Sequence, residues 1–242
     1  MKETGNALFL ILIAVALFAA LSYAVTQSGR GGVSVDRERL ELAAASMMQY
    51  FGSIEQAVNK LRLLGCTEDQ ITFENTTYRG GPAGPHGPNL VINPLGANAN
   101  SPTDNSCHVF NASGGAITAE ILTDVLTTDA LDPGNHAQPG HLWFVVDTIP
   151  GIGSSAADVI LTVPHVSDAI CRAHNKKFGL GGVNGTPINH FWFVSGDQFT
   201  GTFTGSMSGG TVSVPSSTNT WCVSDDPSIL SERHILFVVM AR

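Results

Sequence analysis

The sequence predicts an α+β fold in which a long N-terminal α-helix, hydrophobic first and amphipathic later, packs on a mainly antiparallel β-sheet domain with disulfide-closed loops. No charged residue lies between Glu3 and Arg30, and apolar residues then recur at helical spacing over about residues 34–64. Short β-branched runs separated by glycine-rich turns follow. We therefore expect three parts: residues 1–32, the hydrophobic helix and a glycine break; residues 33–65, its amphipathic continuation; and residues 66–242, a β-rich globular head.

The composition indicates an extracellular kind of protein. Of the 242 residues, those beyond the hydrophobic start are enough for one globular domain with a sizeable core. Charged residues make up only 13% of the chain, and its 26 glycines are typical of a loop-rich and strand-rich domain. The formal net charge of −8 is unfavourable for binding phosphates, so we expect no nucleic-acid partner.

The apolar run over residues 4–29 predicts a membrane-spanning helix. An α-helix rises about 1.5 Å per residue, so about 20 apolar residues match a hydrocarbon core of about 30 Å. A cleaved secretory signal is the alternative, because residues 22–24 resemble a small-x-small cleavage site. The run is longer than the apolar part of a usual signal and its leader is barely basic. We therefore expect the helix to be retained, in a membrane or in a protein core that replaces one.

Three small residues recur at four-residue spacing in this helix, namely Ala16, Ala20 and Ala24. Small residues at that interval lie on one helix face and allow the backbones of neighbouring helices to approach closely. We interpret them as an assembly face, with the alternative that alanine is simply common in such helices.

A glycine break follows the apolar run. Gly29, Gly31 and Gly32 each disfavour a helix by about 1 kcal/mol relative to alanine. Helical periodicity then resumes, with Ser34 or Asp36 as the expected N-cap and Gly65 as the expected C-cap. The predicted apolar stripe of this amphipathic helix consists of Leu40, Ala44, Met47, Phe51, Ile54, Val58 and Leu61.

The chain contains four cysteines, Cys66, Cys107, Cys171 and Cys222. An even count behind an export-like start favours two disulfides in an oxidising compartment. Among the three possible pairings we favour Cys66–Cys107 and Cys171–Cys222, because each closes a loop of about 40–50 residues within one half of the head. Four buried free thiols are the alternative.

The head is predicted mostly from β-branched and aromatic clusters. Residues 119–126 fit either a helix or a strand, and a short helix is predicted over residues 166–175. The predicted strands are residues 71–75, 141–147, 158–163, 190–195, 200–214 as a hairpin, and 234–240.

No pattern makes a good case for catalysis or for a bound cofactor, so we expect a protein that is not an enzyme. Gly151-x-Gly153-x-x-Ala156 resembles a dinucleotide-binding turn, but a strand pattern follows it rather than a helix. His108 and His174 lie near cysteines without the spacing of metal ligands. A calcium site remains a minor alternative at the acidic residues of the loops, which are Asp129, Asp132, Asp225 and Asp226.

The order of an apolar helix, a glycine break, an amphipathic helix and a disulfide-bearing β-domain resembles the type IV pilin and pseudopilin family. In that family the first helix anchors the subunit in the inner membrane and later packs into the filament core. The resemblance makes Gly5 the possible end of a cleaved leader, and Cys171 and Cys222 the equivalents of the late disulfide pair. The family's usual glutamate, five residues after the leader, is replaced here by Leu10.

These patterns lead to a functional hypothesis: a structural subunit of an extracellular pilus-like filament, a homopolymer held together by its N-terminal helix. The resemblance implies a precursor anchored in the inner membrane, followed by a filament at the cell surface. Two alternatives remain open, a single-span anchored periplasmic or surface binding module and an anchored enzyme whose site is not recognisable.

Overall fold

The computed structural model divides into two compact units, Met1–Arg39 and Leu40–Arg242. Backbone is described for residues 5–28, 32–77, 97–125, 140–148, 152–180, 199–203, 218–224 and 233–242. Within the two N-terminal helices, side chains are described from Phe9 to Tyr23 and from Glu38 onward.

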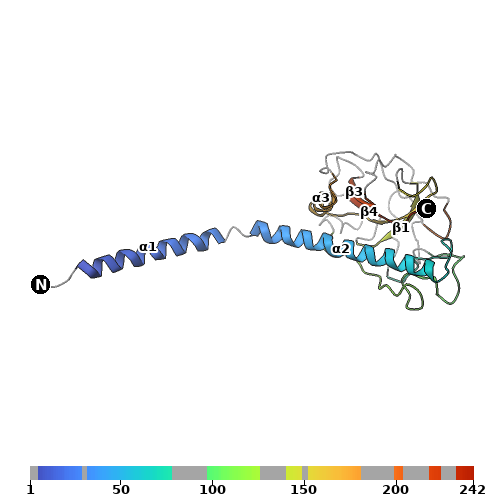
Figure 1. Cartoon of the computed structure of the whole chain (residues 1–242), viewed down its shortest axis with the longest axis horizontal. Helices are drawn as coiled ribbons and strands as arrows, with labels where there is room; N and C mark the ends of the chain where they lie inside the picture. Colours follow the sequence, from blue (N-terminus) through green and yellow to red (C-terminus); the bar gives the residue numbers. More distant parts are fainter. Residues whose placement is uncertain are drawn as a thin grey trace, which may run out of the picture. The chain divides into compact units, whose positions relative to one another are not determined.

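The N-terminal region forms two helices, α1 (Gly5–Ser28) and α2 (Gly32–Leu63) (Figure 1). Gly29 and Gly31 of the predicted glycine break lie outside the described residues, so the break stays a prediction. Gly32 is the first residue of α2, and the predicted N-caps Ser34 and Asp36 lie inside this helix. An N-cap residue stands just before the first residue of its helix, so neither Ser34 nor Asp36 caps α2 and the cap prediction is wrong.

The head contains a four-stranded antiparallel sheet, which confirms the α+β class and the antiparallel pairing. Its strands are β1 (Trp143–Asp147), β2 (Asp158–Val163), β3 (Thr220–Ser224) and β4 (Arg233–Met240), in the order β1-β2-β4-β3. The predictions over residues 141–147, 158–163 and 234–240 correspond to β1, β2 and β4. The predicted strand at 190–195 lies outside the described residues, as does most of the predicted hairpin, and β3 was not predicted.

Alternate side chains of the strands pack on opposite faces of the sheet, and both faces are buried. One face, with Phe144, Leu161 and Phe237, belongs to the main core. The other face, with Ile160 and Leu236, belongs to a second cluster together with Trp221 of β3. Strands that are buried on both sides read as continuous apolar runs, which is why β2 and β4 are easily recognised in the sequence.

Helix α2 contributes its apolar stripe to the main core. Ala44, Met47, Phe51, Ile54, Val58 and Leu61 are all buried, and Leu40 is partly buried against them. The Phe51 ring lies 5.6 Å from the ring of Phe237 in β4. Full burial of a large apolar side chain stabilises the fold by about 1.5–3 kcal/mol, so this stripe is a major part of the stability of the head.

The C-terminal end of α2 is fixed by a capping motif and a disulfide. Gly65 has a φ of +99°, as predicted for the C-cap position. The Gly65 and Cys66 amides donate to the carbonyls of Arg62 and Leu61, which is the paired hydrogen bonding of a Schellman motif. Cys66 then forms a disulfide with Cys107, one of the two predicted pairings.

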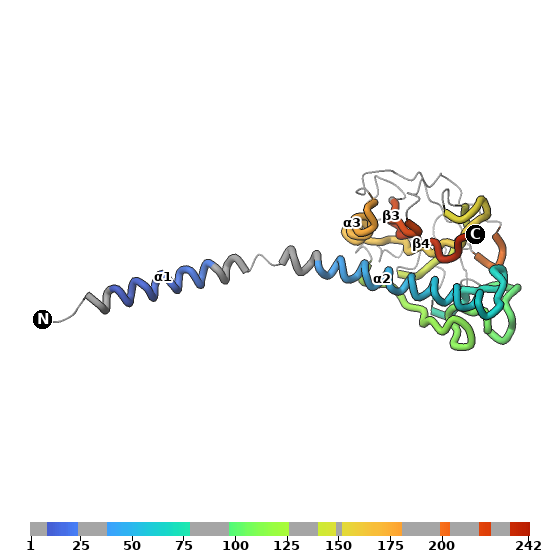
Figure 2. The backbone as a smooth tube through the Cα atoms, viewed as in Figure 1, coloured from blue at the N-terminus to red at the C-terminus, as the bar shows by residue number. Residues whose placement is uncertain are grey.

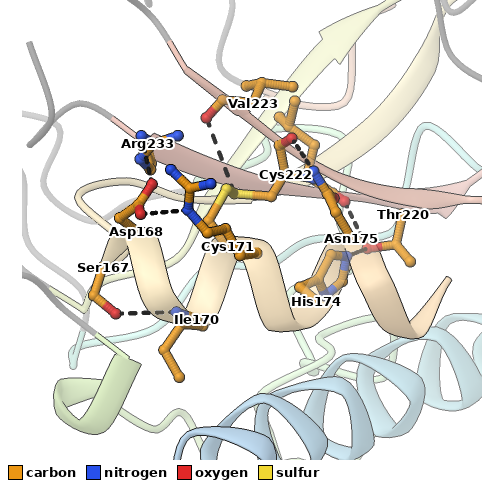
Figure 3. Close-up of a disulfide and its surroundings, with 12 residues drawn as sticks. Ser167, Asp168, Ile170, Cys171, His174, Asn175, Thr220, Cys222, Val223 and Arg233 are labelled. Carbon is orange, nitrogen blue, oxygen red and sulfur yellow. Dashed lines mark hydrogen bonds and ion pairs between the residues drawn. A yellow bond between two sulfur atoms is a disulfide. The ribbon is translucent and has the colours of Figure 1, made fainter. Parts of the chain in front are cut away.

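The second predicted disulfide, Cys171–Cys222, joins α3 (Asp168–Lys177) to the edge strand β3 (Figure 3). Asn175, one turn further along α3, hydrogen-bonds both backbone groups of Cys222: its amide nitrogen donates to the carbonyl at 3.0 Å, and its oxygen accepts from the N–H at 2.8 Å. The Asn175 side chain thus makes the two hydrogen bonds that the backbone of a neighbouring strand would make to Cys222. It satisfies backbone groups that an edge strand would otherwise leave open for pairing with another chain.

His174 is fully buried between α3 and β3 (Figure 3). The hydroxyl of Thr220 donates to the carbonyl of Leu236, so it accepts a hydrogen bond from Nε2 of His174 at 3.1 Å. Nδ1 has no hydrogen-bond partner among the described residues. Burial, together with the charge of Lys177, lowers the pKa of His174 to about 4. Burial, with a smaller effect of His165, lowers the pKa of His234 in β4 to about 3.

Asn175→Asp tests whether the Asn175 side chain stabilises the edge strand β3 by hydrogen-bonding the backbone of Cys222. The aspartate keeps the acceptor for the Cys222 N–H but faces the Cys222 carbonyl with an oxygen instead of a donor. We expect a loss of at least about 2 kcal/mol in the free energy of unfolding, measured by urea denaturation with the disulfides intact. Asn59→Asp, on the exposed face of α2, is the control and should change stability by less than about 0.5 kcal/mol. Equal effects of the two substitutions would contradict this role of Asn175.

The buried histidines predict a loss of stability in mild acid. An unfolded chain binds protons on these histidines below a pKa of about 6.5, whereas the folded chain keeps them neutral until about pH 4 or lower. The free energy of unfolding is therefore highest, as far as these histidines affect it, above pH 6.5. It falls as the pH is lowered, by about 1.4 kcal/mol per pH unit for each histidine. Urea denaturation at pH 7 and at pH 5 measures this slope. His174→Gln, which keeps a donor toward Thr220, should reduce the slope by the contribution of one histidine, and an unchanged slope would contradict the assignment.

Candidate assembly surface and head cavity

Helix α1 exposes its apolar side chains on all sides. Every residue from Phe9 to Tyr23 is exposed, and the large apolar side chains of this segment are between 40% and 72% accessible. The ten of them are Phe9, Leu10, Ile11, Leu12, Ile13, Val15, Leu17, Phe18, Leu21 and Tyr23. Among the described residues from Leu40 onward, by contrast, four large apolar side chains are exposed, those of Leu42, Leu63, Leu64 and Ile121. Scattered exposed residues of that kind are normal, but a continuous apolar segment marks an interaction surface.

The predicted alanine face lies within this exposed segment. Ala16 and Ala20 are exposed, and Ala24 lies in α1 with its side chain outside the described ones. Residues four apart project from the same face of an α-helix, so Ala16 and Ala20 lie on one strip along α1. The backbone of another helix can approach most closely along such a strip.

The other N-terminal positions named from the sequence also fall in or next to α1. Gly5, the possible leader end, is the first residue of the helix, and Leu10 is 60% exposed. Among the residues that the structure describes, no helix combines the length and the apolar character needed to cross a membrane.

The head contains a cavity of about 560 Å³ at its surface. Two chain segments line it: residues 74–77, and residues 105–119, which include Cys107 of the first disulfide. The lining residues are Glu74, Asn75, Thr76, Thr77, Asn105, His108, Phe110, Asn111, Ala112, Ala116, Ile117, Thr118 and Ala119.

The two walls of the cavity are joined at their base. The Cys66–Cys107 disulfide places His108 beside residues 71–73, and Thr72 pairs with His108 as an isolated parallel bridge. The Thr72 amide donates to the Cys107 carbonyl at 3.1 Å, and the Val109 amide donates to the Thr72 carbonyl at 2.9 Å. The predicted strand over 71–75 is therefore reduced to this bridge.

Aromatic packing and two closely packed glycines complete the base of the cavity. Phe73 stacks on Phe144 of β1 at 4.0 Å, and Phe110 contacts the same ring edge-on at 6.0 Å. Gly114 and Gly115 pack closely against the backbone of residues 108–109. A Cβ added at Gly114 would lie 2.3 Å from the His108 carbonyl oxygen, and one added at Gly115 would lie 2.4 Å from the Val109 carbonyl oxygen. No larger residue fits at either position without moving the backbone.

Helix α2 holds the outer wall of the cavity. Residues 97–125, drawn in green, run beside the C-terminal half of α2 (Figure 2). The Tyr50 hydroxyl donates to the Thr118 carbonyl at 2.9 Å and accepts from the Glu120 amide at 3.0 Å. The Lys60 ammonium donates to the Gly114 carbonyl at 3.0 Å. The C-terminal part of this wall is thus attached to the helix at Gly114 and at Thr118–Glu120.

The polar groups of the cavity are mostly neutral. Burial lowers the pKa of His108 below its ordinary value, against the opposing effect of the Glu74 and Asp104 carboxylates, so the imidazole is largely neutral at pH 7. Hydrogen bonds from the side chain and backbone of Ser106 lower the pKa of the exposed Asp104. Glu74 is the one carboxylate among the described residues that line the cavity, and no lysine or arginine lines it.

The structure brings no metal or cofactor site together from the described residues. No group of three or more histidine, cysteine, aspartate or glutamate residues there could hold a metal ion. The acidic pairs considered for calcium lie outside the described residues. Gly153 has a φ of +60° and stands in a turn before β2, so the structure places a strand where a nucleotide-binding turn needs a helix.

The cavity was missed in the sequence because its walls are far apart along the chain. Two local signals were present, since Asn75 and Asn111 each stand two residues before a Thr or Ser. In the structure each asparagine accepts a hydrogen bond from the amide two residues on, which fixes a turn on either side of the cavity.

Comparisons with family models, with curated proteins and with solved structures find no match for this chain.

Proposed function

We propose that the chain is a non-enzymatic structural subunit of an extracellular pilus-like filament, which polymerises by packing α1 against copies of itself. One observation carries the proposal: all residues from Phe9 to Tyr23 are exposed, although most of them are apolar.

Exposure of these apolar side chains to water has a large free-energy cost. Removing a large apolar side chain from water is worth about 1.5–3 kcal/mol, so the ten exposed side chains of α1 amount to on the order of tens of kcal/mol. Association of two chains costs an estimated 4–15 kcal/mol in lost freedom of motion. Burial of α1 among copies of the same helix can therefore outweigh the cost of assembly.

The shape of α1 favours other helices as its cover. The alanine strip of Ala16, Ala20 and Ala24 allows two backbones to approach, and the larger side chains on the remaining faces can contact further neighbours. A helix that is apolar all round is suited to the centre of a bundle, where each side meets another helix.

Before assembly, we place the same segment in the inner membrane. The support comes from the sequence, in which residues 4–29 contain no charged side chain, a run longer than the part of α1 whose side chains are described. The two disulfides favour an oxidising compartment for the head. A cell-surface filament fits both expectations.

The proposed relation to type IV pilins and pseudopilins rests on the same features. Helix α2 packs its apolar stripe on an antiparallel sheet, and a late disulfide closes the C-terminal part of the chain. The exposed Leu10 replaces the glutamate of that family. Subunit contacts in this chain would therefore depend on apolar and small-residue packing rather than on a buried charge.

Ala20→Leu and Ala16→Leu test the alanine strip. Each substitution adds apolar surface but prevents close approach of a second helix, so we expect few or no fibres in negative-stain micrographs of cells that make the variant. Ala14→Leu, the same change off the strip, is the matched control and should leave fibre formation intact. If fibres form normally with both Ala16→Leu and Ala20→Leu, the strip has no role in assembly.

Deletion of residues 1–30 tests whether α1 is the cause of assembly. The remaining chain keeps the closed core of the head and loses the exposed apolar segment, so we expect a monomer in detergent-free buffer by size-exclusion chromatography with light scattering. The full chain should form fibres or require detergent. A truncated chain that still polymerises would place the assembly contacts in the head instead.

A further inference from the structure

We propose that the head cavity between residues 74–77 and 105–119 is a binding site for a neutral carbohydrate. The proposal concerns the head alone and does not depend on assembly through α1.

The cavity has the size and the fixed shape of a ligand site. Its volume of about 560 Å³ lies within the range of about 300–1,000 Å³ that is typical of sites for small organic molecules. Its walls are held by the Cys66–Cys107 disulfide, by the Thr72–His108 bridge and by the contacts of Tyr50 and Lys60. A preformed site loses little conformational entropy on binding, which favours affinity for small ligands.

The polar part of the lining matches the hydroxyl groups of a sugar. The hydroxyls of Thr76, Thr77 and Thr118 both donate and accept hydrogen bonds, and the amide groups of asparagine do the same. His108 in its neutral form has one donor nitrogen and one acceptor nitrogen. Glu74 adds a charged acceptor, and a hydrogen bond to a charged group is stronger than one between neutral groups.

The charge of the lining excludes other ligand classes. A phosphate, sulfate or carboxylate ligand needs arginine, lysine or a comparable cation, and none is present among the described residues that line the cavity. Glu74 would repel such an anion. One carboxylate in an otherwise neutral lining is a weak site for a cation, so a neutral polyol is the best match.

The apolar part of the lining matches the C–H face of a sugar ring. Phe110, Ile117, Ala112, Ala116 and Ala119 provide carbon surface beside the polar groups. The Phe110 ring is held edge-on against Phe144 at 6.0 Å. Mixed linings of this kind bind ligands that have hydroxyls at their edges and carbon atoms on their faces.

The test uses the purified full chain and saturation-transfer-difference NMR. The neutral probes are lactose, maltose, cellobiose and N,N′-diacetylchitobiose, and the charged comparators are sialyllactose and glucosamine. We expect at least one neutral disaccharide to bind, and both charged comparators to bind more weakly than it does.

Two variants locate the binding site. Glu74→Gln removes the charge and His108→Leu removes the imidazole, and each should weaken binding by roughly tenfold or more, as expected for a lost hydrogen bond in a polar site. Glu120→Gln, close in sequence but outside the lining, is the matched control and should bind as the unchanged chain does. Thermal unfolding verifies that each variant is folded, and Thr77→Val replaces any variant that is not.

The proposal is overturned if none of the neutral disaccharides binds, if a charged comparator binds more tightly than they do, or if folded variants retain full affinity. Assembly defects of the α1 variants do not affect this readout, so the failure of one proposal is distinguishable from the failure of the other.

Discussion

Helix α2 buries an apolar side chain in the main core at every third or fourth residue, from Ala44 to Leu61, and the head is arranged around this stripe. The same core includes one face of the sheet, and the Phe51 ring lies 5.6 Å from the Phe237 ring of β4. The last turn of the helix continues into the Cys66–Cys107 disulfide, and its exposed flank holds the outer wall of the cavity through Tyr50 and Lys60. Burial of this one stripe therefore positions the core, the first disulfide and the candidate binding site together.

Helix α1 differs from α2 in how its apolar side chains are distributed. Most of those of α2 lie on one stripe that the head covers, with Leu42 and Leu63 as exposed exceptions, whereas those of α1 between Phe9 and Tyr23 lie on all sides and are exposed. A single sheet or helix covers only one face of its neighbour. A helix that is apolar all round must therefore be surrounded, by lipid or by several other helices. Under the proposed function, α1 is therefore the segment that assembles the filament, and α2 is the segment that completes the core of the head.

Local patterns in the sequence predicted much of the fold, and contacts between distant segments account for what was missed. The stripe of α2, the cap at Gly65, the strands β1, β2 and β4 and both disulfides follow from spacing, composition and cysteine count. Strand β3 begins and ends with a polar residue, Thr220 and Ser224, and its place in the sheet depends on pairing with β4 and on the Asn175 side chain, which no local pattern reveals. The cavity likewise exists because a disulfide and the Thr72–His108 bridge bring two segments together.

Cryo-electron microscopy of fibres sheared from cells that make the full chain tests whether α1 is buried among copies of itself in a filament. We expect fibres in which the residues from Phe9 to Tyr23 form a central bundle of helices, with the heads outside. A chain found only as a monomer in detergent, with no fibre that contains it, would contradict the proposed assembly through α1.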